Sequence, residues 1–286
     1  MGNGAAQSVT QANLKSALAA QDWPDLNMAS GWDEWASNSI EGGSCVKRDS
    51  GVQVCSFGDS QPKKAVLLGD SVAQSWIPGL RSQLEASGYQ LILVNRAGCS
   101  FADARFQEDG QSLPPNAECQ AARADEINAA NENSPELVLI SEVPSRVETL
   151  EGSDGPNAEA YAAGLVKSAS RIWAPDRRIA YVDGPPGGKS LKICKTALSS
   201  PADCVVPVSE SSRAMADASN MFVSGMRDQG KPVAKVGTAD LFCVSDQCPS
   251  FSGETPIYAD GEHPATEYSR SLGAELYGRV KAALQS

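Results

Sequence analysis

Hydrophobic residues along this chain fall into short continuous runs, with longer amphipathic segments between them. Each run has the length and composition of a buried strand: AVLLG (65–69), YQLILVN (89–95), ELVLIS (136–141), RIAYVD (178–183) and PVAKV (232–236). Helices are predicted between them at residues 71–87, 117–131, 158–173 and 209–229. This alternation indicates a mainly parallel sheet covered by helices on both faces. The predicted fold class is therefore α/β, with three α/β/α layers and a five-stranded sheet.

A further helix is predicted at residues 264–284, after the last strand. Its apolar residues recur at every fourth position and share one face: Tyr268, Leu272, Leu276, Val280 and Leu284. Pro264 is suited to the first turn of such a helix. We expect residue 263 at or just before the helix start.

Residues 1–60 have a different character from residues 61–286, which hold the predicted α/β domain. A helical stretch, TQANLKSALAAQDW, leads into a polar segment and then into a loop between two cysteines. We interpret residues 1–60 as an N-terminal extension or linker. Its tryptophans, Trp23, Trp32 and Trp35, are interpreted as packing residues, with a sugar-stacking platform as the alternative.

The eight cysteines follow one another in four short local pairs. Full pairing of eight cysteines has about 105 solutions, and zinc binding is a competing interpretation. However, there is no C-x-x-C motif, and the single histidine is far from most cysteines. We predict sequential disulfides and hence an oxidising compartment: Cys45–Cys55, Cys99–Cys119, Cys194–Cys204 and Cys243–Cys248. The first residues do not resemble a signal peptide, so we expect the exported part of a longer protein.

The charge and hydropathy of the chain exclude some classes of function. The net charge is −11 and the pI about 4.7, which argues against a nucleic-acid partner. No apolar run approaches the roughly 20 residues that span a bilayer. The loop VDGPPGGKS ends like a phosphate-binding loop but lacks the G-x-x-x-x-G-K-[ST] spacing, so no nucleotide site is predicted.

The first candidate for chemistry is Ser71, in the sequence LLGDS at the end of the first predicted parallel strand. Open α/β sheets bind ligands at the carboxyl ends of their strands. A serine at a helix start, after a tight turn at Gly69, is suited to nucleophilic attack beside unpaired amides. The alternative is an N-capping serine.

The second candidate is His263, the only histidine, in YADGEHPATEY. Asp260 precedes it by three residues and can reach the imidazole across a turn. Both follow the last predicted strand, on the same edge of the sheet as Ser71. A Ser-His-Asp triad requires this convergence. A surface histidine that caps the final helix is the alternative.

Three motifs together resemble the SGNH (GDSL-like) hydrolase superfamily: VLLGDSVAQSWIPGL, LILVNRAGCSF and YADGEHPATEYSRSLG. More narrowly, the chain resembles the extracytoplasmic SGNH domain fused to family 3 membrane acyltransferases. The sequence CSFGD before the first parallel strand and Cys99 after the second also suit that group. The resemblance covers residues 40–286 and implies a flavodoxin-like sheet.

This resemblance implies a role for each candidate residue. Ser71 is the expected nucleophile, His263 the general base and Asp260 its orienting acid. The backbone amides of Ser71 and Gly98 are expected to stabilise an oxyanion. For Asp70 we expect a structural role in the turn.

One segment departs from the superfamily pattern. A glycine–asparagine motif normally follows the third strand, and its asparagine completes the oxyanion hole. Here the segment is ISEVPSRV, in which Ser141 is the nearest polar substitute. Ser141 is therefore predicted as a possible third contributor, and slow turnover is expected.

The function implied is transfer of an acyl group, in the favoured case acetyl, to a hydroxyl of a cell-envelope glycan or glycolipid. The expected partner is a membrane acyltransferase domain, fused upstream, that supplies the acyl group. This places the domain on the extracytoplasmic side. No metal or cofactor is implied. The alternatives are a secreted O-acetyl esterase and a catalytically silent glycan-binding module.

Overall fold

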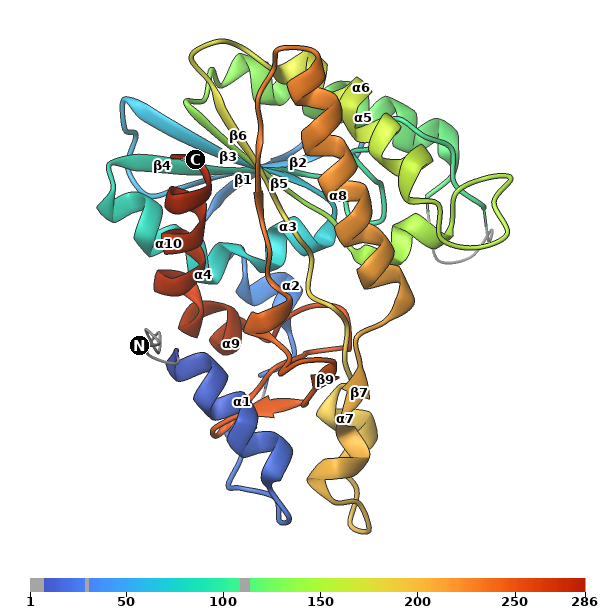
Figure 1. Cartoon of the computed structure of the whole chain (residues 1–286). Coiled ribbons are helices and arrows are strands. Elements are labelled where there is room, and N and C mark those ends of the chain that lie inside the picture. The colour runs from blue at the N-terminus through green and yellow to red at the C-terminus, as the bar shows by residue number, and fades with distance from the viewer. Residues whose placement is uncertain (1–7, 29–30, 109–113, 286) are drawn as a thin grey trace, which may run out of the picture.

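The structure is a computed structural model that describes residues 8–28, 31–108 and 114–285 (Figure 1). Residues 1–7 and 29–30 of the predicted extension lie outside the described residues. A seven-stranded sheet in the order β1-β2-β4-β3-β5-β6-β8 forms the centre of the molecule. Its strands are β1 (Ser44–Lys47), β2 (Gln53–Phe57), β3 (Lys63–Gly69), β4 (Tyr89–Asn95), β5 (Leu137–Ser141), β6 (Arg178–Val182) and β8 (Ala234–Val236). The five strands β4, β3, β5, β6 and β8, in this order across the sheet, pair in parallel. The predicted parallel sheet is therefore confirmed.

The other two strands come from residues assigned to the extension. β1 and β2 form an antiparallel hairpin, and β2 pairs antiparallel with β4 at the edge of the sheet. The sequence analysis did not predict them, because every residue of β1 is exposed and β2 is only partly buried. An edge hairpin of this kind lacks the continuous apolar run on which strand prediction depends. A boundary at residue 60 therefore cuts through the sheet.

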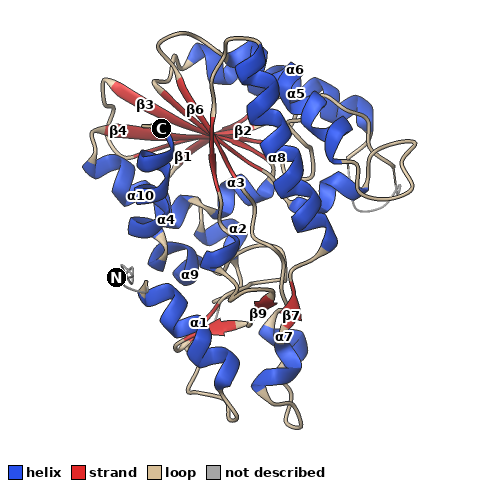
Figure 2. Ribbon diagram, in the orientation of Figure 1, coloured by secondary structure: helices blue, strands red, loops and turns tan. Residues whose placement is uncertain are grey.

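Helices cover both faces of the sheet, as predicted for three α/β/α layers (Figure 2). Alternate residues of β3 enter two separate cores: Ala65 and Leu67 enter one, and Val66 and Leu68 the other. The first core is covered by α3 (Ser71–Ser75), α4 (Ile77–Ala86), α9 (Thr266–Ser271) and α10 (Gly273–Ala283). The second is covered by α5 (Asn116–Glu132), α6 (Ala158–Ile172) and α8 (Glu210–Asp228).

Two predicted helices are each divided into two. The helix predicted at 71–87 breaks at Trp76, and Pro78 lies in the first turn of α4, where its missing N–H is tolerated. The final helix starts at Thr266, because Pro264 is still engaged in a β-bridge with Tyr258. The expected start at Pro264 is therefore wrong by two residues.

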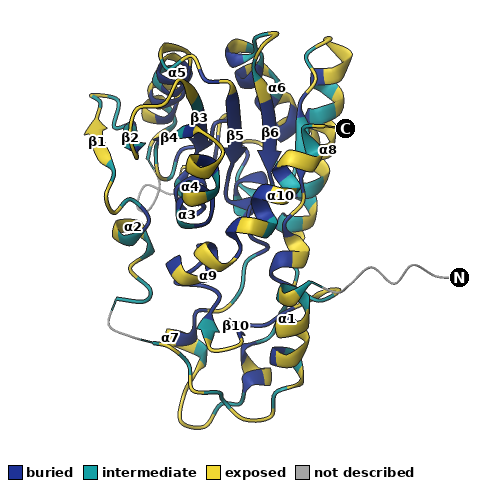
Figure 3. Cartoon of the chain, turned by 90° about the vertical axis from the view of Figure 1, so that its left-hand side faces the viewer, coloured by how far each residue is buried: buried dark blue, intermediate teal, exposed yellow. Residues whose placement is uncertain are grey.

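Below the carboxyl ends of the strands lies a smaller layer, which Figure 3 shows beneath the sheet. It combines the N-terminal helices with the segments that follow β6 and β8. Its small core includes Ala17, Leu191, Cys204 and Phe251. The smaller layer consists of α1 (Val9–Ala19), α2 (Trp35–Asn38), α7 (Leu191–Cys194), β7 (Val206–Pro207), β9 (Gln247–Cys248), β10 (Phe251–Ser252) and β11 (Thr255–Pro256), with the 3-10 helices η2 (Pro201–Cys204) and η3 (Ala239–Leu241). A third 3-10 helix, η1 (Pro144–Glu148), follows β5 in the main domain.

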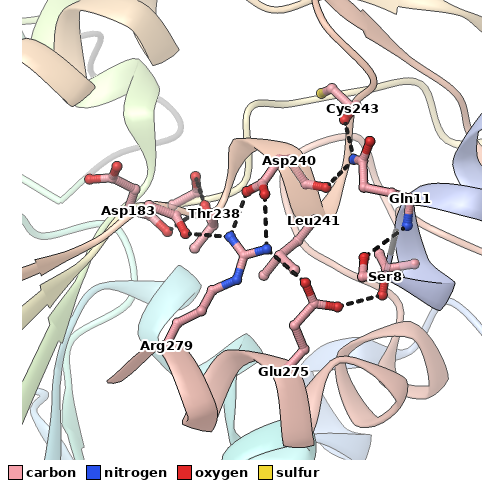
Figure 4. A network of polar contacts seen from close by, with 12 residues as sticks. Ser8, Gln11, Asp183, Thr238, Asp240, Leu241, Cys243, Glu275 and Arg279 are labelled. Carbon is pink, nitrogen blue, oxygen red and sulfur yellow. Dashed lines mark hydrogen bonds and ion pairs between the residues drawn. The ribbon is translucent and has the colours of Figure 1, made fainter. Parts of the chain in front are cut away.

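A network of polar contacts connects α1 to η3 and α10 (Figure 4). The Gln11 side-chain amide donates to the carbonyl oxygens of Asp240 and Cys243. Arg279 of α10 binds Asp240 and Glu275 together. The start of α1 is thereby connected to both η3 and α10.

The eight cysteines form four disulfides, and each joins neighbours in the order of the chain: Cys45–Cys55, Cys99–Cys119, Cys194–Cys204 and Cys243–Cys248. Cys45–Cys55 ties the β1–β2 hairpin, and Cys99–Cys119 joins the loop after β4 to α5. Bonded cysteines of this number favour an oxidising compartment. None of the described helices is long and apolar enough to cross a membrane.

Candidate active site

The strand β3 ends at Gly69, where the backbone turns sharply toward α3. Gly69 has φ of 138°, and a Cβ at this position would lie 2.1 Å from the carbonyl oxygen of Ser141. Only glycine permits this approach of β3 to β5. The next two residues, Asp70 and Ser71, form the N-cap and first residue of α3. Ser71 is therefore held at the carboxyl edge of the sheet and is partly exposed.

The turn around Ser71 is braced by Asp70, which is fully buried. Its two carboxylate oxygens accept from the amides of Val72 (2.8 Å) and Val143 (2.9 Å). Burial raises the pKa of Asp70, while the Val143 amide and the charge of Arg146 oppose that rise. Asp70 thus links the β3–α3 turn to the segment after β5, a structural arrangement.

Ser71, His263 and Asp260 form a continuous line of hydrogen bonds. His263 Nε2 lies 2.8 Å from Ser71 Oγ, and Nδ1 lies 2.8 Å from Asp260 Oδ2. The other Asp260 oxygen accepts from the amides of Glu262 and His263, which closes the turn between the acid and the imidazole. The structure therefore brings together the three residues that the sequence analysis singled out.

The environment of Asp260 favours its ionised form. Burial raises its pKa, but the hydrogen bond and charge of His263 outweigh this effect, together with the amides of His263 and Glu262, and lower the pKa to about 2. An ionised Asp260 accepts a hydrogen bond from Nδ1–H of His263, which leaves Nε2 free of a proton and able to accept one from Ser71. The arrangement can therefore activate the serine as a nucleophile.

Gly98 lies in the loop after β4, the strand that pairs in parallel with β3. Gly98 has φ of 79°, and a Cβ there would lie 2.8 Å from Pro114 Cδ, so this position requires glycine. Its carbonyl oxygen accepts from Arg146 at 2.5 Å. The Cys99–Cys119 disulfide holds the next residue. The loop is fixed on both sides, which suits an amide that must hold a defined direction.

The Ser141 hydroxyl lies in the protein interior. It is fully buried and accepts from the Trp76 indole at 2.9 Å. Ser141 pairs with Gly69 across β5 and β3, so its backbone is close to the turn that bears Ser71. The Ser141 hydroxyl is bonded to the Trp76 indole, and its role in the oxyanion hole stays a prediction.

A cavity of about 300 Å³ adjoins the turn that carries the histidine. Gly261 and Glu262, which directly precede His263, form part of its wall, and Val143, which donates to Asp70, forms another part. The loop at residues 185–188 supplies two prolines and two glycines to the lining. The glycine-rich loop noted in the sequence therefore lines a cavity.

Residues 44–278 match the family of SGNH domains that are fused to AT3 domains. The chain belongs to this family. No curated protein sequence matches it. Among solved structures, this SGNH domain is similar to the periplasmic domain of a lipopolysaccharide acetyltransferase from Salmonella ser. Paratyphi A, with a TM-score of 0.56 and 16% identity over 79% of this chain and 85% of that one.

A second similar structure is a family two carbohydrate esterase from Clostridium thermocellum, solved in complex with cellohexaose. Its TM-score is 0.51, with 10% identity over 80% of this chain and 66% of that one. These likenesses show a common fold. The family supports an enzyme of the esterase or acyltransferase kind for this SGNH domain.

Sequence reasoning missed a tryptophan contact in this SGNH domain. The Trp35 indole stacks on the His263 imidazole, with ring centroids 3.8 Å apart and planes within 10°. Its Nε1 donates to Asp260 Oδ2 at 3.0 Å. No local pattern could have indicated this contact, because Trp35 lies in the N-terminal segment.

Sequence reasoning also missed Glu142, which is fully buried directly after β5. It accepts from the Phe101 amide (2.5 Å) and from the Tyr161 hydroxyl (2.8 Å). Burial, and then the charge of Asp70, raise its pKa to about 7. An acid placed immediately after the continuous apolar run LVLIS was the signal that could have revealed it. In the described part of the chain, no group of three or more His, Cys, Asp or Glu residues could hold a metal ion.

Proposed function

We propose that this SGNH domain transfers an acyl group, in the favoured case acetyl, to a hydroxyl of a cell-envelope glycan or glycolipid. The observation that carries the proposal is the pair of 2.8 Å contacts from Ser71 to His263 and from His263 to Asp260. A serine, a base and an orienting acid in this order are the constellation used for acyl transfer.

In the first half-reaction, Ser71 Oγ attacks the carbonyl carbon of the acyl donor as its proton passes to His263 Nε2. The amides of Ser71 and Gly98 are the proposed donors to the oxyanion of the tetrahedral intermediate. The Val72 amide is already used by Asp70, so it is not counted among them. Collapse of the intermediate breaks the bond to the leaving group, which takes the proton from His263.

In the second half-reaction, the hydroxyl of the acceptor gives its proton to His263 Nε2 and attacks the acyl-serine carbonyl. A new ester forms on the acceptor, the bond to Ser71 Oγ breaks, and the proton returns from His263 to the serine. Asp260 stays ionised throughout and stabilises the imidazolium that forms in each half.

The membrane domain of the longer protein is the proposed source of the acyl group. SGNH domains of this family are fused to AT3 domains. The four disulfides favour an oxidising compartment. We therefore place the SGNH domain on the extracytoplasmic side, where envelope glycans are accessible.

The cavity beside Gly261 and Glu262 is the proposed acceptor site. Its volume of about 300 Å³ is at the lower end of small-molecule sites. Proline rings supply flat apolar walls, and the serine hydroxyls of Ser145, Ser209 and Ser212 supply hydrogen-bonding groups. This combination fits one sugar ring, which has both apolar faces and hydroxyl edges.

The alternative function is hydrolysis of an O-acetyl ester, in which water takes the place of the acceptor hydroxyl. It is favoured by the similarity in fold to the carbohydrate esterase. The two functions use the same triad, because water and a sugar hydroxyl attack the acyl-serine alike.

Labelling with a fluorophosphonate tests the shared part of the proposal. We expect the probe to form one adduct, on Ser71, and we expect no adduct in the Ser71→Ala or His263→Gln variants. Absence of labelling in the folded wild-type domain would favour a silent glycan-binding module.

A further inference from the structure

We propose that Trp35 is a positioning residue for the triad, and that the N-terminal segment thereby completes the active site. The catalytic role of this contact rests on the proposed function. The contact itself is observed, because one indole touches both His263 and Asp260. The sequence predicted Trp35 as a packing residue, and the structure gives it a more specific position.

The indole holds the imidazole and the carboxylate at the same time. Its ring face covers the His263 ring, with a centroid distance of 3.8 Å and an interplanar angle of 10°. Its Nε1 donates at 3.0 Å to Asp260 Oδ2, the same oxygen that is 2.8 Å from His263 Nδ1. The stack restricts tilting of the imidazole, and the N–H restricts rotation of the carboxylate.

Asp260 needs such support because its side chain is 47% exposed. The amides of Glu262 and His263 hold Oδ1 from within the same turn. Within the described part of the chain, Oδ2 contacts the imidazole and the indole, and the indole is the partner from outside the turn. Loss of the indole would leave this oxygen to water, which competes for the hydrogen bond to Nδ1.

The position of Trp35 is itself determined by the helix that carries the nucleophile. Gln74, three residues after Ser71 on α3, is buried and donates to the Ala36 carbonyl (2.7 Å) and to the Ser39 hydroxyl (3.0 Å). Both acceptors lie in or next to α2. One side chain of α3 therefore sets the place of the short helix whose indole covers the histidine.

The arrangement also favours the charged state that the reaction requires. When His263 takes a proton, an imidazolium lies against the face of an indole, which attracts cations. The same charge lies beside ionised Asp260. Asp260 and Asp70 both interact electrostatically with the imidazole. The side chain of Glu262, the residue before His263, accepts a hydrogen bond from Ser145. The Trp35 indole is uncharged and covers one face of the imidazole.

Two substitutions separate the functions of the indole. Trp35→Phe keeps an aromatic face over His263 and removes the N–H to Asp260, whereas Trp35→Leu removes both. Trp23→Phe is the matched control, because Trp23 Nε1 donates to the Ser199 carbonyl and Trp23 packs in the core of the smaller layer. Circular dichroism and thermal unfolding verify that each variant is folded.

The first readout is hydrolysis of an activated acetyl ester, with fluorophosphonate labelling of Ser71 beside it. We expect Trp35→Leu to lower kcat and the labelling rate by roughly tenfold, with KM within about twofold of wild type. Trp35→Phe is expected to lie between Trp35→Leu and wild type, and Trp23→Phe to equal wild type. Unchanged kcat and labelling in both Trp35 variants would overturn the proposal.

The second readout does not depend on activity. Because the chain has one histidine, a single imidazole Nδ1–H signal in proton NMR reports the His263–Asp260 hydrogen bond. We expect this signal to broaden and exchange faster with water in Trp35→Leu, and to stay unchanged in Trp23→Phe. If the signal changes while the wild-type domain neither labels nor turns over, the proposed function fails and the positioning by Trp35 holds. An unaltered signal in Trp35→Leu would contradict the positioning.

Discussion

His263 Nε2 lies 2.8 Å from Ser71 Oγ, although 192 positions separate the two residues in the chain. The parallel sheet explains this meeting. Ser71 follows β3 at the carboxyl edge, and the segment after β8 returns across the same edge before α9 begins. A bridge between Tyr258 and Pro264 closes the loop that presents Asp260 and His263. The triad is thus a product of strand direction together with one tight turn.

The Ser71→Ala variant tests the role of the nucleophile. We expect hydrolysis of an activated acetyl ester to fall on the order of 10³-fold or more, because no neighbour can replace the attacking oxygen. Ser75→Ala on the same helix is the control, since the Ser75 hydroxyl donates to the Val72 carbonyl within α3. Equal turnover by Ser71→Ala and wild type would remove the central assignment.

The pH dependence of the same reaction tests His263. Asp260 has its pKa lowered to about 2, so it stays ionised through the usual assay range. The acid limb of the rate profile should therefore follow the loss of a proton from the sole imidazole, and His263→Gln should flatten it. Glu142→Gln is the control, because the pKa of Glu142 is raised to about 7 and its ionisation falls in the same range. A limb that survives in His263→Gln would mean that another base operates.

Glu142 should make the folded state less stable as the pH rises. Its pKa is raised on folding, so its contribution to stability is fully present below pH 4.5 and is lost as the pH rises through 7. At about 1.4 kcal/mol per pKa unit, the rise from 4.5 to about 7 corresponds to on the order of 3 kcal/mol. Glu142→Gln keeps an acceptor for the Phe101 amide and removes the ionisation.

Urea unfolding of Glu142→Gln and wild type at several pH values measures this effect. We expect similar free energies of unfolding near pH 4 and a more stable variant at pH 8. Glu136→Gln is the control, because Glu136 is an exposed acid that precedes the same strand. Curves for Glu142→Gln and wild type that run parallel from pH 5 to 8 would show that Glu142 carries no such penalty.

The parallel strands could be predicted from local apolar runs. The meeting of Ser71, Asp260 and His263 could be predicted from their positions after such runs, together with the resemblance of their motifs to the family. The central strands are largely continuous apolar runs, and Ser71 comes two residues after the end of β3. The hairpin β1–β2 could not be predicted, since every residue of β1 is exposed and the pairing of β2 with β4 is set by the edge of the sheet. The prediction for Ser141 relied on its position after an apolar run. Because β5 is buried on both faces, that run does not indicate which side its hydroxyl takes.

The contact of Trp35 with His263 could not be predicted for a different reason. It depends on where α2 docks, and that docking depends on Gln74 of a distant segment. A four-residue helix has no hydrophobic period that could indicate its partner. Contacts of this kind follow from tertiary packing alone.

The Cys99–Cys119 disulfide should matter for activity more than a disulfide remote from the triad. It holds the loop beside Gly98, a proposed oxyanion donor, against α5. We expect a Cys99→Ala/Cys119→Ala variant to lose both stability and acetyl-ester hydrolysis. The control is Cys194→Ala/Cys204→Ala, which removes a disulfide of the smaller layer and should affect stability more than turnover. Activities are compared at a temperature where both are folded, and equal losses of activity would contradict the prediction.

The last prediction separates acyl transfer from hydrolysis. A transferase gains when its acceptor is bound beside the acyl-serine, because a bound hydroxyl competes effectively with water. We therefore expect slow hydrolysis of a small acetyl ester by the isolated domain. Saccharides or glycolipids of the envelope should accelerate consumption of the donor, and mass spectrometry should find the acetyl group on their hydroxyls.

The variant Ser145→Trp connects this result to the proposed acceptor cavity. Ser145 is partly exposed on the cavity wall, and its hydroxyl contacts Glu262 rather than the triad. An indole there should fill the cavity and suppress transfer to the saccharide at least roughly tenfold, while slow hydrolysis of the small ester continues. Undiminished transfer by Ser145→Trp would place the acceptor elsewhere. Rapid deacetylation of acetylated glycans by wild type, without transfer to any acceptor, would instead establish the esterase, because water would then be the preferred nucleophile.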